Sequence, residues 1–527
     1  PTNNDWFSWN GSGSSFRFDA TGFAVLKKVL VANRGEIAVR ILRTLREMGI
    51  ASVAVYSDAD RDSLHVRRAD QAYPIGPAPA VDSYLRIDRL IDAAKRSGAD
   101  GLAPGYGFLA ENPELAEACE GSGIRFIGPP ASAMRLLGSK VSARRVFAEA
   151  GAPIVPGGEA GSVEEATATA ERVGYPILLK ANAGGGGKGM RRVESQTQLL
   201  PLLERARSEA GRAFGDDSVY IEKVLSNPRH VEIQLMGDQE GNLVHLFERD
   251  CSIQRRFQKV VEETPCPAIT AELVERMAVC ALRGARDAGY YSAGTVEFLL
   301  DEHGQFYFLE MNTRLQVEHP ITELCTGIDL VKQMLHVASG GSLLLTQEQV
   351  VRSGVAIQCR VYAENPARGF LPSPGRIGVL IAPSGPGVRD DSGITSGSWV
   401  SPNYDPLISK LCVWAPDRDT ALARMRRALG EYVVTGIDTN LAFHQSLFQH
   451  PEFVGGRYDT GFIDRHLAEL AKGTPIGESD RTALALAIAV SAYASERGAR
   501  EGRGLDGPSP WLAAHRARLA AGRNRVR

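Results

Sequence analysis

The runs TVEFLL (295–300) and QFYFLE (305–310) are separated by only four residues, DEHG (301–304). Both runs are rich in strand-forming residues and the segment between them favours a turn, so together they predict a β-hairpin. With a two-residue loop at 303–304, Glu297 lies directly opposite Glu310, although a one-residue bulge would shift this register. Facing carboxylates destabilise a ladder unless a cation neutralises them. The hairpin therefore predicts a divalent metal site.

The polar pattern continues beyond the hairpin. If the chain stays extended, its period of two places Glu310, Asn312, Arg314, Gln316 and Glu318 on one face. Asn312 adds an oxygen ligand suited to magnesium, and Arg314 brings a planar fork that binds anions. An amphipathic edge strand with a wet face has a similar pattern, but the ligand chemistry favours a metal and an anion.

A glycine-rich segment precedes the hairpin in the chain. The apolar run PILLK (176–180) ends in a lysine, and AGGGGKG (183–189) follows. Four consecutive glycines expose backbone N–H groups, which is typical of a phosphate-binding loop, although a flexible linker has the same composition. The segment has neither the Gly-Lys-Ser/Thr ending of a Walker loop nor the Gly-x-Gly-x-x-Gly of a dinucleotide site.

Residues 248–263 form a third polar segment, ERDCSIQRRFQKVVEE. Its charges indicate either a surface lattice of ion pairs or part of a site. Cys251 is interpreted as a packed thiol, because no base accompanies it in sequence. Lysines are scarce, yet Lys180, Lys188, Lys223 and Lys259 all lie in or beside these segments, where an ammonium group can meet phosphate or carboxylate oxygens.

The whole chain of 527 residues, with a net charge of −2, predicts several folded domains and no general attraction to nucleic acid or to an anionic membrane. From residue 28, alternating strand and helix patterns predict a doubly wound domain, with a glycine turn at 101–108. The seven cysteines are scattered and form no Cys-x-x-Cys pair, so we expect a cytoplasmic protein. No histidine spacing supports a His-based metal site, and any metal should be held by oxygen.

Together these segments resemble the biotin carboxylases, the ATP-grasp ligase component of biotin-dependent acyl-CoA carboxylases, which belong to fatty acid metabolism. The similarity covers residues 28–467, and its most specific parts are the segment 310–320 and RVYAENP at 360–366. The other matching segments are ANRGEIA (32–38), PGYGFL (104–109), NPRHVE (227–232) and ERDCSIQRR (248–256).

The resemblance implies a fold of α/β and α+β type in several parts. These are a doubly wound N-terminal domain (28–138), an ATP-grasp domain (139–345) with a mobile glycine-rich lid (about 152–224) and a C-terminal biotin carboxylase domain (355–467). Composition alone adds an aromatic-rich N-terminal arm (1–27) and a helical, arginine-rich extension (468–527). The resemblance also implies a homodimer that works with a biotin carboxyl carrier protein or domain and with a carboxyltransferase subunit.

The resemblance further implies roles for particular residues. ATP would be bound by Lys140, Lys180, Gly186, Gly187, Glu222, Lys223, Leu225, His230, Glu297 and Glu310. Magnesium or manganese would be coordinated by Glu297, Glu310 and Asn312. Bicarbonate would be bound by Lys259, Arg314, Gln316 and Val317, with Glu318 as the base that deprotonates it and Arg360 as the residue that stabilises the biotin enolate.

The sequence departs from the family pattern at three places. Ala103 and Phe257 stand where histidine is usual, and we expect a hydrogen bond to ATP to be missing. Asn182-Ala183 opens the lid loop where Ser-Gly or Ala-Gly is usual. Two rivals to the catalytic interpretation are another ATP-grasp ligase and a non-catalytic scaffold subunit.

The carboxylase to which the chain contributes is a separate question. SPNYDPLISKL (401–411) is similar to the α-subunits of propionyl- and methylcrotonyl-type carboxylases. Those subunits carry biotin on a Met-Lys-Met sequence, which does not occur in these 527 residues. We therefore expect the carrier to be separate or the chain to be shortened, and the acyl-CoA to be chosen by another polypeptide.

Overall fold

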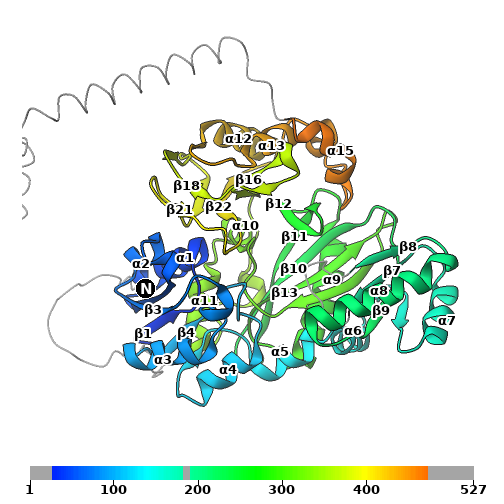
Figure 1. Cartoon of the computed structure of the whole chain (residues 1–527), viewed down its shortest axis with the longest axis horizontal. Coiled ribbons are helices and arrows are strands. Elements are labelled where there is room, and N and C mark those ends of the chain that lie inside the picture. The colour runs from blue at the N-terminus through cyan, green and yellow to red at the C-terminus, as the bar shows by residue number, and fades with distance from the viewer. Residues whose placement is uncertain (1–25, 182–189, 473–527) are drawn as a thin grey trace, which may run out of the picture. The chain divides into compact units, whose positions relative to one another are not determined.

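The structure is a computed structural model that describes residues 26–181 and 190–472 (Figure 1). Gly186 and Gly187 of the predicted lid lie outside the described residues, as do 1–25 of the predicted arm and 473–527 of the predicted extension. Within the described ranges, no helix has the length and apolar character needed to cross a bilayer.

The first domain is built on a parallel sheet with the strand order β3-β2-β1-β4-β5. Its central strand β1 (Lys28–Val31) pairs with β2 (Ala51–Ser57) on one side and with β4 (Gly101–Ala103) on the other. Because the direction of winding reverses between β1 and β4, the loops that follow these strands flank a crevice. This topology confirms the predicted doubly wound domain. The remaining elements are β3 (Gln71–Gly76), β5 (Arg125–Phe126), α1 (Gly35–Glu47), α2 (Leu64–Arg68), α3 (Ile87–Ser97) and α4 (Pro113–Glu120).

An antiparallel sheet of eight strands runs through the rest of the chain. Five of its strands come from the predicted ATP-grasp domain and three from the predicted C-terminal domain, and the two groups join where β12 pairs with β15. The sheet is therefore continuous across the expected boundary at 345–355. In spatial order the strands are β14 (Phe306–Asn312), β13 (Ser292–Leu300), β10 (Arg229–Gly237), β11 (Leu243–Arg255), β12 (Gln258–Thr264), β15 (Val355–Tyr362), β22 (Leu407–Ala415) and β20 (Val388–Ser392).

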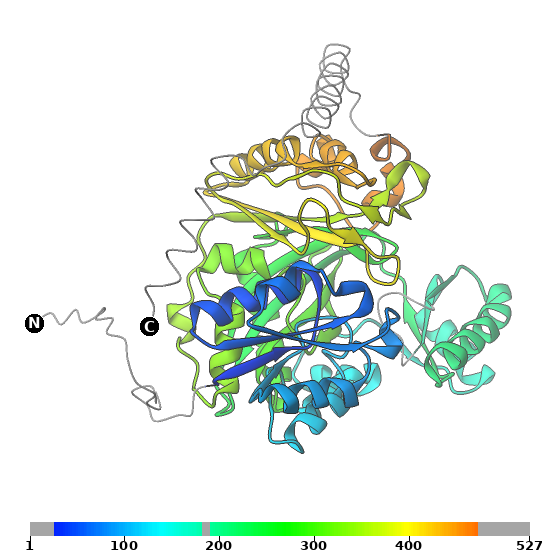
Figure 2. The ribbon, with the colours of Figure 1, turned by 60° about the vertical axis from the view of Figure 1, so that its left-hand side comes forward.

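Helices cover this sheet in two groups. One core joins α5 (Ala131–Gly138), α6 (Lys140–Glu149) and α9 (Ala271–Asp287) to strands β10, β13 and β14. Another joins α12 (Arg418–Glu431), α13 (Leu441–Leu447), α14 (Pro451–Val454) and α15 (Phe462–Leu470) to β15 and β22. α10 (His319–Thr326) and α11 (Leu330–Ala338) follow the hairpin, and α1 of the first domain lies beside β20 and β22 (Figure 2).

A separate four-stranded sheet occupies the predicted lid region. Its core joins apolar residues of α7 and α8 to its strands, so it folds around its own small core. The elements are β6 (Gly157–Glu159), β9 (Val219–Lys223), β7 (Ile177–Ala181), β8 (Arg191–Val193), α7 (Val163–Val173) and α8 (Gln196–Phe214). Three strand pairs complete the fold: β16 (Glu364–Asn365) with β17 (Leu371–Pro372), β18 (Gly375–Arg376) with β21 (Trp399–Val400), and β19 (Leu380–Ile381) with β23 (Val433–Val434).

The hairpin β13–β14 has the predicted pairing of Glu297 with Glu310, but the predicted loop is wrong. Leu300 pairs with Phe306, so five residues form the loop, and the Asp301 carboxylate organises it by accepting the N–H groups of His303 and Gln305. A bulge between Glu297 and Phe298 then shifts the register by one residue. The longer loop and the bulge offset each other, which is why the carboxylates still face one another.

Candidate active site

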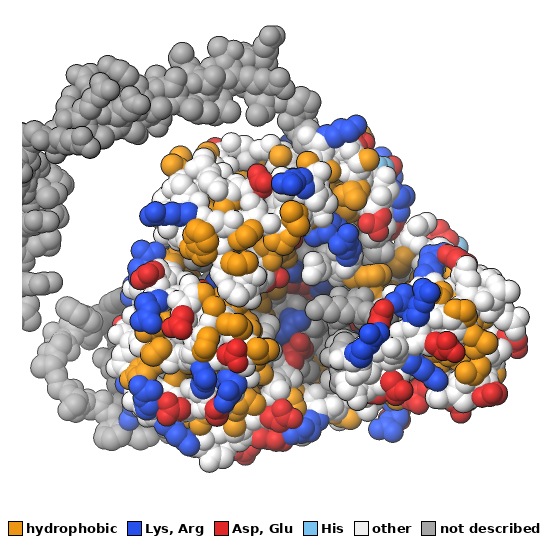
Figure 3. All heavy atoms as spheres, in the orientation of Figure 1, with side chains coloured by type: hydrophobic (Ala, Val, Ile, Leu, Met, Phe, Trp, Pro, Cys, Tyr) orange, Lys and Arg blue, Asp and Glu red, His pale blue; other side chains and the backbone are white. Residues whose placement is uncertain are grey.

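A cleft of about 1310 Å³ opens between the domains. Figure 3 shows it as a hollow with basic and acidic side chains inside. Of the site residues predicted from sequence within the described ranges, all but Glu318 line it, and Glu318 lies fully buried behind Lys259 and Arg360. Those that line it are Lys140, Lys180, Glu222, Lys223, Leu225, His230, Lys259, Glu297, Glu310, Asn312, Arg314, Gln316, Val317 and Arg360.

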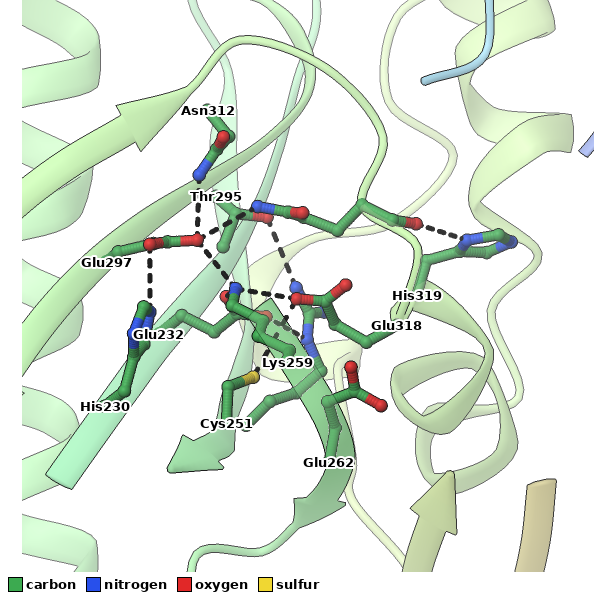
Figure 4. A network of polar contacts seen from close by, with 12 residues as sticks. His230, Glu232, Cys251, Lys259, Glu262, Thr295, Glu297, Asn312, Glu318 and His319 are labelled. Atoms are coloured by element: carbon green, nitrogen blue, oxygen red, sulfur yellow. Dashed lines mark hydrogen bonds and ion pairs between the residues drawn. The ribbon is translucent and has the colours of Figure 1, made fainter. Parts of the chain in front are cut away.

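Lys259, near the start of β12, is the centre of the site (Figure 4). Its Nζ lies 2.5 Å from Glu232 Oε2, 2.7 Å from Glu297 Oε1 and 2.7 Å from Glu318 Oε1. Burial lowers the pKa of Lys259, but Cys251 and these carboxylates more than offset it and hold the pKa well above its usual value. One fixed positive charge thus brings together three strands and the start of α10.

Glu318 has two cationic partners. Besides Lys259, Arg360 Nη2 lies 2.9 Å from Glu318 Oε2, and Arg360 Nε donates to Glu262 Oε1 at 2.6 Å. Burial raises the pKa of Glu318, but Lys259 and Arg360 outweigh burial, so its pKa lies well below the usual range. The pairing of β12 with β15 brings Arg360 here, although nearly a hundred residues separate it from Glu262 in sequence.

Sequence reasoning missed three charged residues beneath this cluster. Arg249 is fully buried and donates to Glu232 Oε1 at 2.5 Å, to Gln234 Oε1 at 2.7 Å and to Thr322 Oγ1 at 2.9 Å. Glu232 and Glu262 are also fully buried. For Arg249 and Glu262 the segment 248–263 contained the signal, since β11 and β12 turn its alternating charges inward, whereas Glu232 comes from β10. The surface-lattice alternative is therefore wrong.

The predicted metal ligands lie on the facing strands of the hairpin. Glu297 Oε1 accepts from Asn312 Nδ2 at 2.8 Å, and Glu297 Oε2 lies 2.9 Å from His230 Nε2. Glu310 Oε2 contacts Lys140 Nζ at 3.1 Å and faces the cleft. Glu297 and Glu310 offer two carboxylates, and the Asn312 amide oxygen, which here accepts from Arg314, would have to turn toward them to complete an all-oxygen set. With that turn, the three side chains fit magnesium.

The predicted anion site does not arise from an extended strand, and that expectation is wrong. β14 ends at Asn312, and the chain then turns into α10 with Glu318 as the residue before the helix. Arg314 donates to Asn312 Oδ1 at 2.8 Å and to Gln316 Oε1 at 2.9 Å, while Gln316 Nε2 lies 3.3 Å from Glu297 Oε1. The turn, rather than a period of two, brings these side chains together.

Three of the predicted nucleotide residues, Lys180 on β7 and Glu222 and Lys223 on β9, lie on the lid side of the cleft. Glu222 is buried between Lys180 and Arg144, whose Nη1 donates to it at 2.6 Å. Burial raises the pKa of Glu222, but Lys180 and Arg144 more than offset it. Lys223 Nζ donates to the carbonyl oxygens of Gly174 at 2.8 Å and Tyr175 at 3.0 Å. Arg144, which is buried against Glu222 and does not line the cleft, was not predicted.

Three family profiles match the chain. They are "Biotin carboxylase, N-terminal domain" at residues 25–134, "Carbamoyl-phosphate synthase L chain, ATP binding domain" at 139–346 and "Biotin carboxylase C-terminal domain" at 358–465. Biotin carboxylase 1 of Bacillus subtilis is 50% identical over 445 residues, which cover 84% of this chain and 99% of the relative. The chain belongs to the biotin carboxylase family.

The biotin carboxylase fold, with its ATP-grasp domain, is confirmed by solved structures. The biotin carboxylase domain dimer of Hydrogenobacter thermophilus 2-oxoglutarate carboxylase, in complex with MgADP, ADP and bicarbonate, has a TM-score of 0.83 at 44% identity and covers 86% of this chain and 100% of that one. Campylobacter jejuni biotin carboxylase has a TM-score of 0.82 at 46% identity, covering 84% of this chain and 99% of that one. The chain is therefore an ATP-grasp ligase.

Other relatives belong to different carboxylases. A pyruvate carboxylase component of Methanothermobacter thermautotrophicus is 51% identical, covering 84% of this chain and 90% of the relative. The alpha chain of the mitochondrial methylcrotonoyl-CoA carboxylase of Mus musculus is 48% identical, covering 88% of this chain and 65% of the relative. Relatives that are about equally similar to this chain thus belong to carboxylases of different substrates, pyruvate and methylcrotonoyl-CoA.

Ala103 does not lie where the departure from the biotin carboxylase pattern suggested. It is buried among Ile41, Ile127 and Leu315 beside an apolar cavity of about 10 Å³, and it does not line the cleft. The expectation that this position costs a hydrogen bond to ATP is therefore wrong. Phe257, by contrast, lines the cleft and is 56% exposed.

Phe257 occupies a strained turn. Arg255 pairs with Gln258, so Arg256 and Phe257 form a two-residue loop, with φ values of +50° and +64°. Such loops favour Asn and Gly, because side chains with a Cβ are strained at positive φ. An exposed aromatic ring at this position stabilises neither the turn nor a core.

We expect Phe257→His to lower the apparent KM for MgATP, because the imidazole supplies a polar contact that a phenyl ring lacks. The measurement is the rate of ADP release against MgATP concentration. Phe257→Gly is the matched control, because it removes the ring without adding a polar group. Glycine also removes the backbone strain at positive φ, so this variant should raise the free energy of unfolding by about 1 kcal/mol without lowering KM. An unchanged KM in Phe257→His would mean that the site has already compensated for the ring.

Proposed function

We propose that this protein carboxylates biotin on a biotin carboxyl carrier protein or domain, using ATP, Mg²⁺ (or Mn²⁺) and bicarbonate, as the first half-reaction of an acyl-CoA carboxylase. One observation carries the proposal: Glu318 lies between Lys259 and Arg360, and Lys259 also contacts Glu297 beside the oxygen-rich hairpin. The proposed base, two cations and one of the proposed metal ligands, Glu297, thus form one continuous set of contacts.

Bicarbonate would bind among Lys259, Arg314, Gln316 and Val317. Glu318 would take its proton, so that the bicarbonate oxygen attacks the γ-phosphorus of ATP and ADP leaves. The product, carboxyphosphate, would break down to carbon dioxide and phosphate. That phosphate would take the N1′ proton of biotin, and Arg360 would stabilise the resulting enolate, which attacks carbon dioxide.

The low pKa of Glu318 is compatible with this role. Bicarbonate is an anion and would compete with Glu318 for Lys259. The biotin enolate would likewise compete with Glu318 for the guanidinium of Arg360. As these cations turn toward the substrates, the charged form of Glu318 is stabilised less, and its pKa rises toward the range in which a carboxylate acts as a base. The substrates would therefore activate their own base.

The nucleotide would be bound from both sides of the cleft. Lys140 and Lys180 would exchange their contacts with Glu310 and Glu222 for phosphate oxygens. Glu222, Lys223 and Leu225 would line the adenine, and His230 would contact the ribose. Glu297, Glu310 and Asn312 would hold the magnesium ion, which disperses charge during phosphoryl transfer.

We propose a homodimer that acts with a biotin carrier and a carboxyltransferase subunit. The dimer is supported by the H. thermophilus relative, which is a domain dimer. The carrier and transferase are supported by relatives that are subunits of larger carboxylases.

The test is ADP release with MgATP and bicarbonate, with and without free biotin, in wild type and Arg360→Ala. We expect biotin to stimulate release in wild type only, while the variant keeps its slow biotin-independent release. Release that ignores biotin in wild type would favour another ATP-grasp ligase. No release under any condition would favour a scaffold.

A further inference from the structure

His319, the first residue of α10, is buried to one side of the Lys259 cluster (Figure 4) and is connected to it through Gln316. Its Nδ1 lies 2.7 Å from the carbonyl oxygen of Gln316, and its backbone N–H donates to the same oxygen at 3.4 Å. Because a carbonyl oxygen only accepts, Nδ1 carries the ring proton. His319 therefore donates two hydrogen bonds to the Gln316 carbonyl oxygen, one from its ring and one from its backbone.

This carbonyl belongs to the turn that delivers two side chains to the site. The Gln316 amide lies 3.3 Å from Glu297 Oε1, and Glu318 contacts Lys259 at 2.7 Å. The two residues flank Val317, and no β-ladder holds this segment, since β14 ends at Asn312. Their directions therefore depend on how the turn is fixed.

The other ring nitrogen of His319 faces positive charge. Nε2 is buried and has no hydrogen-bond partner among the described residues, and the nearest carboxylate oxygen, Glu323 Oε2, is 4.0 Å away. Burial, with Lys410, Arg40 and Arg389 nearby, holds the pKa of His319 well below its usual value. Lys410 comes from β22 and Arg40 from α1. The first and last domains thus keep the ring neutral, with its single proton on Nδ1.

We infer that His319 is a positioning residue, whose Nδ1–H bond to the Gln316 carbonyl fixes the turn that presents Gln316 and Glu318 to bicarbonate. The inference rests on the proposed function, which assigns bicarbonate to this turn. His319 itself does not line the cleft, so it acts only through these neighbours.

The test compares three replacements in the full chain. Asparagine places an amide N–H close to the position of Nδ1, glutamine places it closer to Nε2, and alanine removes both. We expect His319→Ala and His319→Gln to raise KM for bicarbonate or lower kcat by about 10- to 100-fold, with KM for MgATP near that of wild type. His319→Asn should recover most of the loss.

His65→Ala is the matched control for losing a buried imidazole. His65 is also fully buried, and its Nε2 lies 3.2 Å from the carbonyl oxygen of Val55, away from the cleft lining. It should lower the melting temperature and leave both KM values unchanged.

Two results would overturn the inference. One is equal activity of His319→Ala, His319→Gln and His319→Asn, and the other is a loss that affects MgATP and bicarbonate alike. Failure of the proposed function looks different, because ADP release by wild type itself would then ignore biotin or be absent under every condition.

Discussion

Glu318→Gln is expected to lower kcat for biotin-dependent ADP release by about 10²- to 10⁴-fold, the usual contribution of a general base. The amide keeps the size of the side chain but cannot take a proton from bicarbonate. KM for MgATP should stay near the wild-type value, since Glu318 does not line the cleft. Steady-state rates at saturating bicarbonate provide the measurement.

The fold should tolerate this change. Lys259 keeps Glu232 and Glu297 as partners, and Arg360 keeps Glu262. Glu263→Gln is the matched control, since Glu263 is a buried carboxylate on β12 that pairs with Arg418 and does not line the cleft. It should lower stability and spare kcat. A Glu318→Gln enzyme with more than a tenth of wild-type kcat would contradict the assigned role.

Lys259→Met should reduce both activity and stability. It leaves Glu232, Glu297 and Glu318 buried without their shared cation, and removing one partner of a buried ion pair costs about 3–5 kcal/mol. Denaturant titration should show this loss in the free energy of unfolding, and ADP release should fall by at least about 10³-fold, because bicarbonate loses its cation.

Lys259→Arg separates the two effects. It keeps the charge, so much of the stability should return, but a planar guanidinium cannot reproduce the three contacts of one ammonium group. We therefore expect activity to stay low. Equal stability of Lys259→Met and wild type would show that the three carboxylates do not depend on Lys259.

In the hairpin, the sequence predicted the right pair of facing residues but the wrong loop length. A two-residue loop at 303–304 predicted that Glu297 faces Glu310, and the pairing is present. The loop has five residues rather than two, and a bulge restores the register. Turn length depends on the Asp301 side chain and its backbone partners, which a count of apolar positions does not include.

Ala103 shows the opposite case. Alanine in place of the family's usual histidine suggested a missing hydrogen bond to ATP, yet the side chain points into the apolar core shared by α1 and α11. The direction of a side chain at the end of a strand depends on the pleat and on what packs against it. A motif position alone does not specify this direction.

The sequence was enough to predict the doubly wound first domain. It also predicted which chemical groups form the site, namely the facing carboxylates of the hairpin and the lysines and arginines in the polar segments. Which charges meet is a property of the tertiary structure. Arg360 reaches Glu318 because β15 pairs with β12, and Lys410 reaches Glu36 because the last domain packs on α1. Such contacts depend on strand order and domain packing, which join residues far apart in the chain and leave no local periodicity in sequence.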